Sequence, residues 1–530
     1  MRERACCRMS GISRRRFLQA GAGTLTSLAL ARAARAVPPA EGTERKSGPP
    51  NILLLVDALH RADCLAAAGN SAIRTPNLDR LAAEGARFSL AYSSVPGPFP
   101  GRMALLTGQG PWGHGMLGFT AIPDDMPIEC PRLLRTGGYY ALGMGRLLFT
   151  PPRHPHGYNK TILDGGSMET DSPDDYLKWF TAKEPDTDPS VTVGGPKGSI
   201  TWPWPFDEKH HVTYWTADQV VDFLDKREGE APFYVGVFFS HPRMPFAVPK
   251  RFLNMYEETD LPKARVGQWA EERYGKFTQC SPLEATRCNA GEERVREARL
   301  GIYASITFLD EQIGRILDSL KKHNLHENTL VLFTSTNGEM AGDQHMWGTS
   351  YPYEASARIP MVLRWPESLL KGAKRGQVLS QPVELRDVAP TLLDAAGLPI
   401  PSAVEGRSLL DLVQGKSEGW REHIDLEHCI HVWRRNNWNA LTDGKWKYIF
   451  EAYDGTQQLF HLAEDPHELR DLASDPKHAA EVQKWRKRLI AHLSVRDERW
   501  VKDGELVLRK ERLMTGPNFP GGERGKFFDQ

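Results

Sequence analysis

Cysteine is scarce in this sequence, with seven residues in a chain of 530. Two of them lie in the first, basic stretch, and the other five do not have the spacing of a metal site: Cys64, Cys130, Cys280, Cys288 and Cys429. A cysteine-based metal centre is therefore not expected. Cys280 and Cys288 could form a disulfide in an oxidising compartment, and two buried free thiols are the alternative that the sequence leaves open.

A net charge is also lacking, because Lys plus Arg and Asp plus Glu both number 67. A neutral chain has no long-range field to attract nucleic acid or an anionic membrane surface, so neither is expected as a partner. Hydrophobic residues make up 40% and charged residues 25% of the composition. A chain of this length and composition can bury a core as one large or two unequal domains.

The N-terminal apolar run, from Ala20 to Leu30, is too short to span a membrane as a permanent helix. It follows Ser13-Arg14-Arg15-Arg16-Phe17-Leu18-Gln19, which has the pattern of a twin-arginine export box. It precedes Ala34-Arg35-Ala36, a small-residue cleavage motif. Residues 1–36 are therefore expected to be a signal peptide. The mature protein is expected to be periplasmic or secreted, without a membrane span.

Segments typical of strands and helices alternate along the chain. Three continuous apolar runs have the length of buried strands: Asn51–Val56, Phe233–Phe239 and Thr329–Thr334. A helix is predicted from Pro76 with Thr75 as its N-cap. Apolar residues at helical spacing predict another helix before the third strand: Ile306, Leu309, Ile313, Ile316, Leu317 and Leu320. This order predicts an α/β fold with a large, mostly parallel sheet flanked by helices.

The pattern changes after about Gly415. A hairpin is predicted with its turn at Asp443-Gly444, and a closing helix from about Lys477 to Leu493. The stretch from Thr150 to His211 is rich in Pro, Gly and aromatic residues, and it is predicted to form insertion loops near the mouth of a pocket.

A short motif indicates the family. Pro100, Arg102 and Leu106-Thr107-Gly108 have the order and spacing of the sulfatase signature. The chain thus resembles the sulfatases of the alkaline-phosphatase-like superfamily from about Pro49 to about Leu493. Gly143-Met144-Gly145 and Pro245-Phe246 are similar to the iduronate-2-sulfatase-like subgroup.

This resemblance implies the domain organisation. The expected parts are the signal peptide, a sulfatase-like α/β domain, a smaller C-terminal antiparallel-sheet domain and a tail: residues 1–36, 49–415, 416–495 and 496–530.

The resemblance also implies that a catalytic group is missing. The family motif begins with a Cys or Ser that is oxidised to formylglycine, and the hydrated aldehyde attacks sulfur. That position is Pro98, whose ring carries no heteroatom that could serve as a nucleophile or be oxidised to an aldehyde. The motif Ser is Gly101. Ser93 and Ser94 are the nearest upstream hydroxyls, and no base is visibly placed to activate either.

Sulfatases hold a calcium ion with paired acidic and amide or imidazole ligands at the ends of two strands. By resemblance the first pair here is Asp57 and Ala58, and the second is Thr336 and Asn337. Calcium takes six to eight oxygen ligands, with most of the charge supplied by carboxylates. Asp57 and Asn337 would be weak ligands without partners. No cofactor is therefore expected, and calcium is the metal expected if any is bound.

The side chains that handle sulfate in the family differ too. The family lysine after Gly is Arg146, the histidine of Pro-His-x-Pro-Phe is Arg243, and the lysine after Trp-Gly is Thr349. Acid and base groups are thus lost, while Arg102, Arg146 and Arg243 form a candidate anion-binding set. Trp202 and Trp204 are candidate surfaces for stacking on sugar rings.

Three functional hypotheses follow. The first, which these residues favour, is an exported, catalytically inactive sulfatase relative that binds sulfated or carboxylated glycans. The second is an active sulfuric ester hydrolase with rearranged catalytic residues. The third is a structural partner of active sulfatases. A purely structural alternative also applies to the arginines, each of which would pair with a nearby acid such as Asp57 and fill the cavity.

Overall fold

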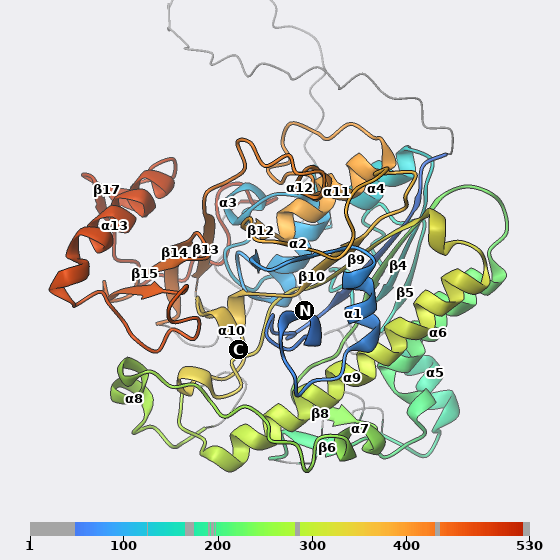
Figure 1. Cartoon of the computed structure of the whole chain (residues 1–530), viewed down its shortest axis with the longest axis horizontal. Helices are drawn as coiled ribbons and strands as arrows, with labels where there is room; N and C mark the ends of the chain where they lie inside the picture. Colours follow the sequence, from blue (N-terminus) through green and yellow to red (C-terminus); the bar gives the residue numbers. More distant parts are fainter. Residues whose placement is uncertain are drawn as a thin grey trace, which may run out of the picture. The chain divides into compact units, whose positions relative to one another are not determined.

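The computed structural model describes residues 48–522 apart from 125, 165–173, 189–190, 192–194, 197, 281–286 and 430–434. At its centre is an eight-stranded sheet (Figure 1). Its strands, in spatial order, are β11 (Gln377–Leu379), β2 (Ala86–Phe88), β10 (Met361–Arg364), β9 (Thr329–Ser335), β1 (Asn51–Asp57), β7 (Phe233–Phe238), β4 (Tyr140–Gly145) and β5 (Lys160–Leu163). Only β10 is antiparallel to its neighbours, so the predicted mostly parallel sheet is confirmed.

Strand β1 shows why the central strands of this sheet have continuous apolar sequences. Ile52 and Leu54 belong to the core on one face, and Leu53 and Leu55 belong to the core on the other face. All four side chains are at most 1% exposed. Alternate side chains of a strand point to opposite faces, so a strand covered on both sides needs apolar residues at every position.

Helices cover both faces of the sheet. The face of Leu53 packs on α1 (Pro76–Ala83), α6 (Val212–Lys226) and the long α9 (Glu292–Lys322). The face of Leu54 packs on α2 (Pro98–Thr107), α4 (Cys130–Thr136), α11 (Val388–Ala396) and α12 (Leu409–Val413). In Figure 1, α9 runs along one side of the sheet, and α2, α4, α11 and α12 lie on the other.

The C-terminal region forms a second, antiparallel sheet, as predicted. Its strands are β13 (Ile424–Cys429), β14 (Asn437–Thr442), β15 (Trp446–Glu451) and β16 (Gln457–His461). The predicted hairpin joins β14 to β15, and the closing helix α13 (Ala479–Leu493) buries Trp485 and Leu489 in a shared core. After α13, the short hairpin β17 (Val501–Lys502) and β18 (Glu505–Leu506) follows.

The remaining α-helices and strands of the described residues are short. They are β3 (Ala91–Tyr92), α3 (Pro111–His114), α5 (Asp175–Lys183), β6 (Thr201–Pro203), β8 (Phe246–Val248), α7 (Lys250–Asn254), α8 (Gln268–Tyr274), α10 (Glu354–Ala357) and β12 (Val383–Glu384). Strands β6 and β8 pair in parallel, as do β3 and β12.

Two details differ from the sequence predictions. The stretch from Thr150 to His211 is not composed of loops alone, because β5 forms the edge strand of the main sheet beside β4. Thr75 stands at the N-cap of α1, but its hydroxyl donates to the Asp79 carboxylate at 3.1 Å instead of accepting from the helix. The Asp310 carboxylate of α9 accepts from the Leu78 amide at 2.8 Å and so caps α1 from a distant segment.

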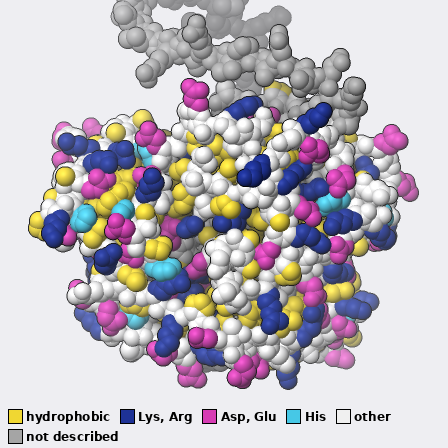
Figure 2. Space-filling view, in the orientation of Figure 1, with side chains coloured by type: hydrophobic (Ala, Val, Ile, Leu, Met, Phe, Trp, Pro, Cys, Tyr) yellow, Lys and Arg dark blue, Asp and Glu magenta, His cyan; other side chains and the backbone are white. Residues whose placement is uncertain are grey.

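Cys280 and Cys288 form a disulfide, which decides between the two alternatives that the sequence left open. Among the described residues, no helix combines the length and apolar character that crossing a membrane requires. The predicted signal peptide lies outside the described residues. Lys and Arg side chains are interspersed with Asp and Glu over the face that Figure 2 shows, as expected for a chain without net charge.

Candidate functional site

The candidate residues from distant parts of the sequence meet where strands of the main sheet end. The Thr336 amide, after β9, donates to the Asp57 carbonyl at the end of β1 at 3.2 Å. Helix α2 begins at Pro98, and the Thr349 hydroxyl donates to the carbonyl of Pro96 just before it at 3.0 Å. The structure therefore brings the predicted nucleophile position, the two metal-ligand segments and Thr349 into one region.

Arg102 ties this region together through backbone carbonyls. Its Nε donates to the Arg146 carbonyl at 2.8 Å, and Nη1 donates to the Pro98 carbonyl at 3.1 Å. The guanidinium lies over the Phe238 ring, 5.3 Å from its centre. Burial lowers the pKa of Arg102 to about 10. Arg102 thus links the start of α2 to the end of β4, through hydrogen bonds to carbonyls and not through the ion pair considered from the sequence.

The candidate metal ligands are engaged with protein groups. Oδ2 of Asp57 lies 2.7 Å from Nδ1 of His60, while Oδ1 is buried without a hydrogen-bond partner in the described part of the chain. Burial raises the pKa of Asp57, against the opposing effect of His60. Oδ1 of Asn337 accepts from the Thr336 hydroxyl at 3.0 Å, and its Nδ2 donates to the Gly338 carbonyl at 3.0 Å.

These residues do not fit a calcium ion. They supply one carboxylate, already paired with an imidazole, and one amide oxygen, whereas calcium takes six to eight oxygen ligands. Across the described residues, no group of three or more His, Cys, Asp or Glu side chains is arranged to hold a metal ion.

Helix α2 and the end of β9 pack directly against each other at the position of the motif serine. A Cβ placed on Gly101 would lie 2.9 Å from Cβ of Thr336 and 3.2 Å from its Cγ2. Such distances are shorter than normal van der Waals contact. A side chain at position 101 would thus collide with Thr336.

Three arginines gather beside this contact. Burial and the positive charges of Arg243 and Arg102 lower the pKa of Arg146 to about 9, and Asp164 acts in the opposite direction. No hydrogen bond or ion pair joins the Arg146 guanidinium to another described residue. Arg146 and Arg243 are half-buried, whereas Arg102 is 3% exposed, so the first two face the surface more than the third. The three arginines predicted to bind an anion thus lie near one another, and the Asp57 carboxylate pairs with His60 and not with any of them.

Asp164, at the end of β5, is the site residue that the sequence interpretation missed. It is completely buried and accepts from the Ser240 hydroxyl at 2.6 Å and from the Thr216 hydroxyl at 3.1 Å. Burial raises its pKa to about 6, although Ser240 and Arg146 favour the charged form. An acidic residue directly after an apolar strand could have indicated this position. Strand β5 was not recognised in the sequence, so Asp164 was missed.

Two histidines border the arginines as neutral rings. His241 and His211 lie with their ring centres 4.9 Å apart. Burial lowers the pKa of His211 to about 4. Burial, His211 and the nearby arginines hold the pKa of His241 well below its usual range. Neither ring is therefore protonated near neutral pH, and the positive charge of the site comes from the arginines.

The other candidates from the sequence are engaged elsewhere. The hydroxyl of Ser94 donates to the Glu384 carboxylate, and that of Ser93 to the Val95 carbonyl at 3.2 Å. Both serines are buried, so neither is placed as an exposed nucleophile. Trp204 is 6% exposed and its indole donates to the Asp207 carbonyl at 3.1 Å, so little of its ring is accessible to a sugar. Trp202 is half-buried.

Comparison with known proteins decides the family. The family model named Sulfatase matches residues 50–398, and the model for the C-terminal part of N-sulphoglucosamine sulphohydrolase matches residues 342–495. The chain is 34% identical to an arylsulfatase of Clostridium perfringens over 484 residues, which is 88% of this chain and 98% of that one. The chain belongs to the sulfatase family.

Other sulfatase relatives are more distant. A choline-sulfatase of Rhizobium meliloti is 28% identical over 81% of this chain and 84% of its own length. The iduronate 2-sulfatase of Mus musculus is 24% identical over 66% of this chain and 69% of its own length. Among solved structures, the phosphonate monoester hydrolase of Agrobacterium radiobacter superposes with a TM-score of 0.72 at 24% identity, covering 87% of this chain and 99% of the other. This likeness confirms the fold.

Proposed function

We propose that this sulfatase-family protein is exported and catalytically inactive, and that it binds sulfate- or carboxylate-bearing sugars at Arg146 and Arg243. It works in this proposal without a metal cofactor, outside the cytoplasm, and without nucleic acid as a partner. The observation that carries the proposal is the Gly101–Thr336 contact next to Pro98. By family resemblance, Gly101 and Thr336 stand at the positions of the motif serine and a metal-ligating carboxylate, and Pro98 stands at that of the nucleophile.

The chemistry of the family needs groups that these residues do not offer. Attack on sulfur requires a nucleophile with a heteroatom, a cation to orient it and an acid for the leaving alcohol. Pro98 stands at the first position of α2, where its ring suits the helix start and its side chain offers no heteroatom. His241 and His211 are neutral and buried, which does not suit either of them to replace the lost acid.

Anion binding is supported by the charges that remain. The positive charges of Arg243 and Arg102 lower the pKa of Arg146, and the Asp164 carboxylate opposes them. A guanidinium holds oxyanions through forked hydrogen bonds, and it stays charged near neutral pH even with a lowered pKa. A sulfate ester or a carboxylate would relieve the repulsion between Arg146 and Arg243. We infer that the bound group is an anion held at the half-buried end of this cluster.

A second candidate function is an active sulfuric ester hydrolase, and the 34% identical arylsulfatase favours it. The decisive measurement is release of sulfate from an aryl sulfate and from sulfated oligosaccharides, with purified protein, in the presence of calcium and after chelation. We expect no turnover in either condition. Sulfate release that follows the protein through purification, and that is abolished by Arg146→Ala, would establish the hydrolase and refute the proposal.

Binding is tested by titrating a panel of sulfated and carboxylated oligosaccharides into the protein. We expect saturable binding that weakens as salt is raised, and loss of binding in Arg146→Ala/Arg243→Ala. The matched control is Arg251→Ala/Arg499→Ala. It removes two arginines outside the site that are more exposed and that pair with acids. Equal affinity in all three proteins, or none in any, would refute the glycan proposal and favour a structural partner of active sulfatases.

A further inference from the structure

Two neighbouring histidines in the segment between β4 and β5 have ring nitrogens without partners. The rings of His154 and His156 lie with their centres 4.5 Å apart. Nδ1 of His154 and Nε2 of His156 are both buried, and neither has a hydrogen-bond partner among the described residues. Buried polar atoms in proteins are nearly always paired, so two unpaired nitrogens on adjacent rings need an explanation.

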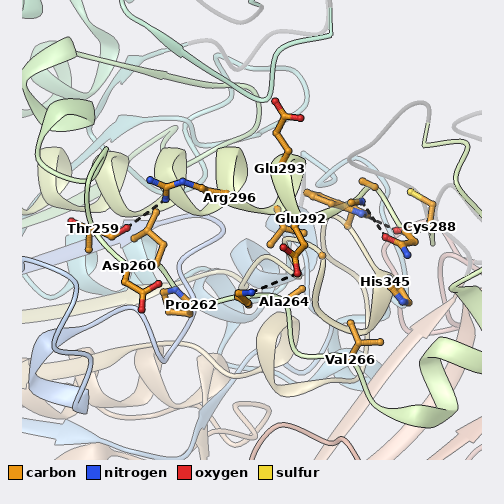
Figure 3. Close-up of a pocket in the computed structure, with 18 of the residues that line it drawn as sticks. Thr259, Asp260, Pro262, Ala264, Val266, Cys288, Glu292, Glu293, Arg296 and His345 are labelled. Atoms are coloured by element: carbon orange, nitrogen blue, oxygen red, sulfur yellow. Dashed lines mark hydrogen bonds and ion pairs between the residues drawn. The ribbon is translucent and has the colours of Figure 1, made fainter.

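A histidine beside a cavity elsewhere in the chain shows the contrast. His345 borders a cavity of about 790 Å³, where Figure 3 labels it. Its Nε2 lies 2.6 Å from the Glu271 carboxylate, and neither of its ring nitrogens is buried without a partner. Its hydrogen bonding is thus satisfied within the protein, whereas that of His154 and His156 is not.

The Glu129 carboxylate orients the His156 ring. Its Oε1 lies 2.8 Å from Nδ1 of His156, and both side chains are completely buried. Arg132 approaches the other carboxylate oxygen at 2.8 Å and balances its charge. An ionised carboxylate only accepts hydrogen bonds, so Nδ1 of His156 carries the proton and Nε2 keeps its lone pair, directed away from Glu129. Histidines that bind metal ions in proteins are commonly held in this way by a carboxylate on the second nitrogen.

The backbone fixes His156 next to Glu129. The Tyr158 amide donates to the Pro155 carbonyl at 2.8 Å, which closes a turn around His156. Gly157 has a φ of +86°, and a Cβ on it would collide with the backbone nitrogen of Arg132 in the first turn of α4. The segment therefore passes directly against the start of α4, and the ring of His156 is in place before any ligand arrives.

The separation of the two rings fits two imidazoles on one metal ion. A metal–nitrogen bond of about 2.0 to 2.1 Å places the centre of an imidazole about 3.2 Å from the ion. Two such rings at a right angle have centres about 4.5 Å apart, and a tetrahedral angle separates them by about 5.2 Å. The observed 4.5 Å matches the right angle. A right angle is typical of the square-planar and tetragonal sites that Cu²⁺ forms with nitrogen and oxygen ligands.

We propose that His154 and His156 bind a Cu²⁺ ion, with Glu129 as a positioning residue and water at the remaining coordination positions. His154 is half-buried, so the ion and water can reach the pair from the surface. The site shares no residue with the arginines Arg102, Arg146 and Arg243 or with the metal positions of the family motif. It stands whether or not the protein binds glycans or hydrolyses sulfate esters.

The test is titration of Cu²⁺ into the purified, untagged protein, followed by electron paramagnetic resonance. We expect one ion whose spectrum shows coupling to two imidazole nitrogens, and loss of this signal in His154→Gln/His156→Gln. The matched control, His323→Gln/His461→Gln, removes two histidines that pair with acids elsewhere and should bind as the wild type does. Glu129→Gln keeps the shape of the side chain but not its charge, and should weaken Cu²⁺ binding by about tenfold or more.

Three results would overturn the proposal. The first is a wild-type spectrum without coupling to two nitrogens, in which case a water molecule that donates to both rings would explain the unpaired atoms. This result needs no variant, so it applies even if a substitution prevents folding. The second is a signal that persists in the double histidine variant. The third is an unchanged Cu²⁺ affinity in Glu129→Gln, which would remove the carboxylate from the site.

Discussion

Restoring the motif serine with Gly101→Ser should destabilise the protein. The new Cβ would lie 2.9 Å from Cβ of Thr336 and 3.2 Å from its carbonyl oxygen, in a region where Thr336 is completely buried. Overpacking of this kind costs about 1 to 3 kcal/mol, and a buried hydroxyl without a partner costs about 1 to 3 kcal/mol more. Replacing a helical glycine with serine returns about 0.5 kcal/mol. The net loss is therefore about 1.5 to 5.5 kcal/mol.

Urea unfolding measures this loss as a lower midpoint with an unchanged slope. The Thr336→Gly background removes Cβ and Cγ2 of Thr336, two of the atoms that the new side chain would meet, and leaves the carbonyl oxygen, so there Gly101→Ser should cost at least about 1 kcal/mol less. The reasoning fails if Gly101→Ser unfolds at the wild-type midpoint. It also fails if the substitution costs the same in both backgrounds, since the contact with Thr336 would then not be the cause.

Further outcomes are expected for the catalytic motif, for Asp164 and for the disulfide. Pro98→Cys alone should not restore sulfate release, because Ala58 and Thr336 still offer no carboxylates, and activity together with an aldehyde detected by mass spectrometry would contradict this. Asp164→Asn should tighten anion binding at neutral pH by about tenfold, because it removes a negative charge beside Arg146. Wild-type binding should also tighten as pH falls below about 6, where Asp164 is protonated. Titrations from pH 5 to 8 check both. Because its folded pKa is raised above 3.8, Asp164 also makes folding less favourable as pH rises from about 4 to about 6. Reducing the Cys280–Cys288 disulfide, which spans eight positions, should lower the free energy of unfolding by about 2.5 kcal/mol, and Cys280→Ser/Cys288→Ser should be insensitive to reductant.

The main sheet could be predicted because a strand that is buried on both faces has apolar residues at nearly every position. Strands β1, β7 and β9 are central, so each appears as an uninterrupted apolar run. Strand β5 was missed because it is four residues long and lies at the edge of the sheet, where only Leu163 is buried. An edge strand needs no second apolar face, and its sequence resembles that of a loop.

The candidate site could be predicted only as far as a family motif assigns positions. Arg146 and Arg243 were found in this way, because each replaces a residue of known place in the pattern. Asp164 has no such place. Its hydroxyl partners Thr216 and Ser240 are 52 and 76 positions away, and no periodicity in the sequence connects them. Buried polar groups that depend on distant partners become visible only in three dimensions.

The positions that differ from the family motif are connected to one another in the structure. Thr336 contacts Gly101, and its amide donates to the carbonyl of Asp57. The Asp57 carboxylate is in turn held by His60. A carboxylate at position 336 would lie beside a buried aspartate without the compensation of a metal ion, and a serine at position 101 would meet Thr336. Reversing one of these substitutions alone would therefore be unfavourable while the others remain. A return to the family arrangement requires several simultaneous changes.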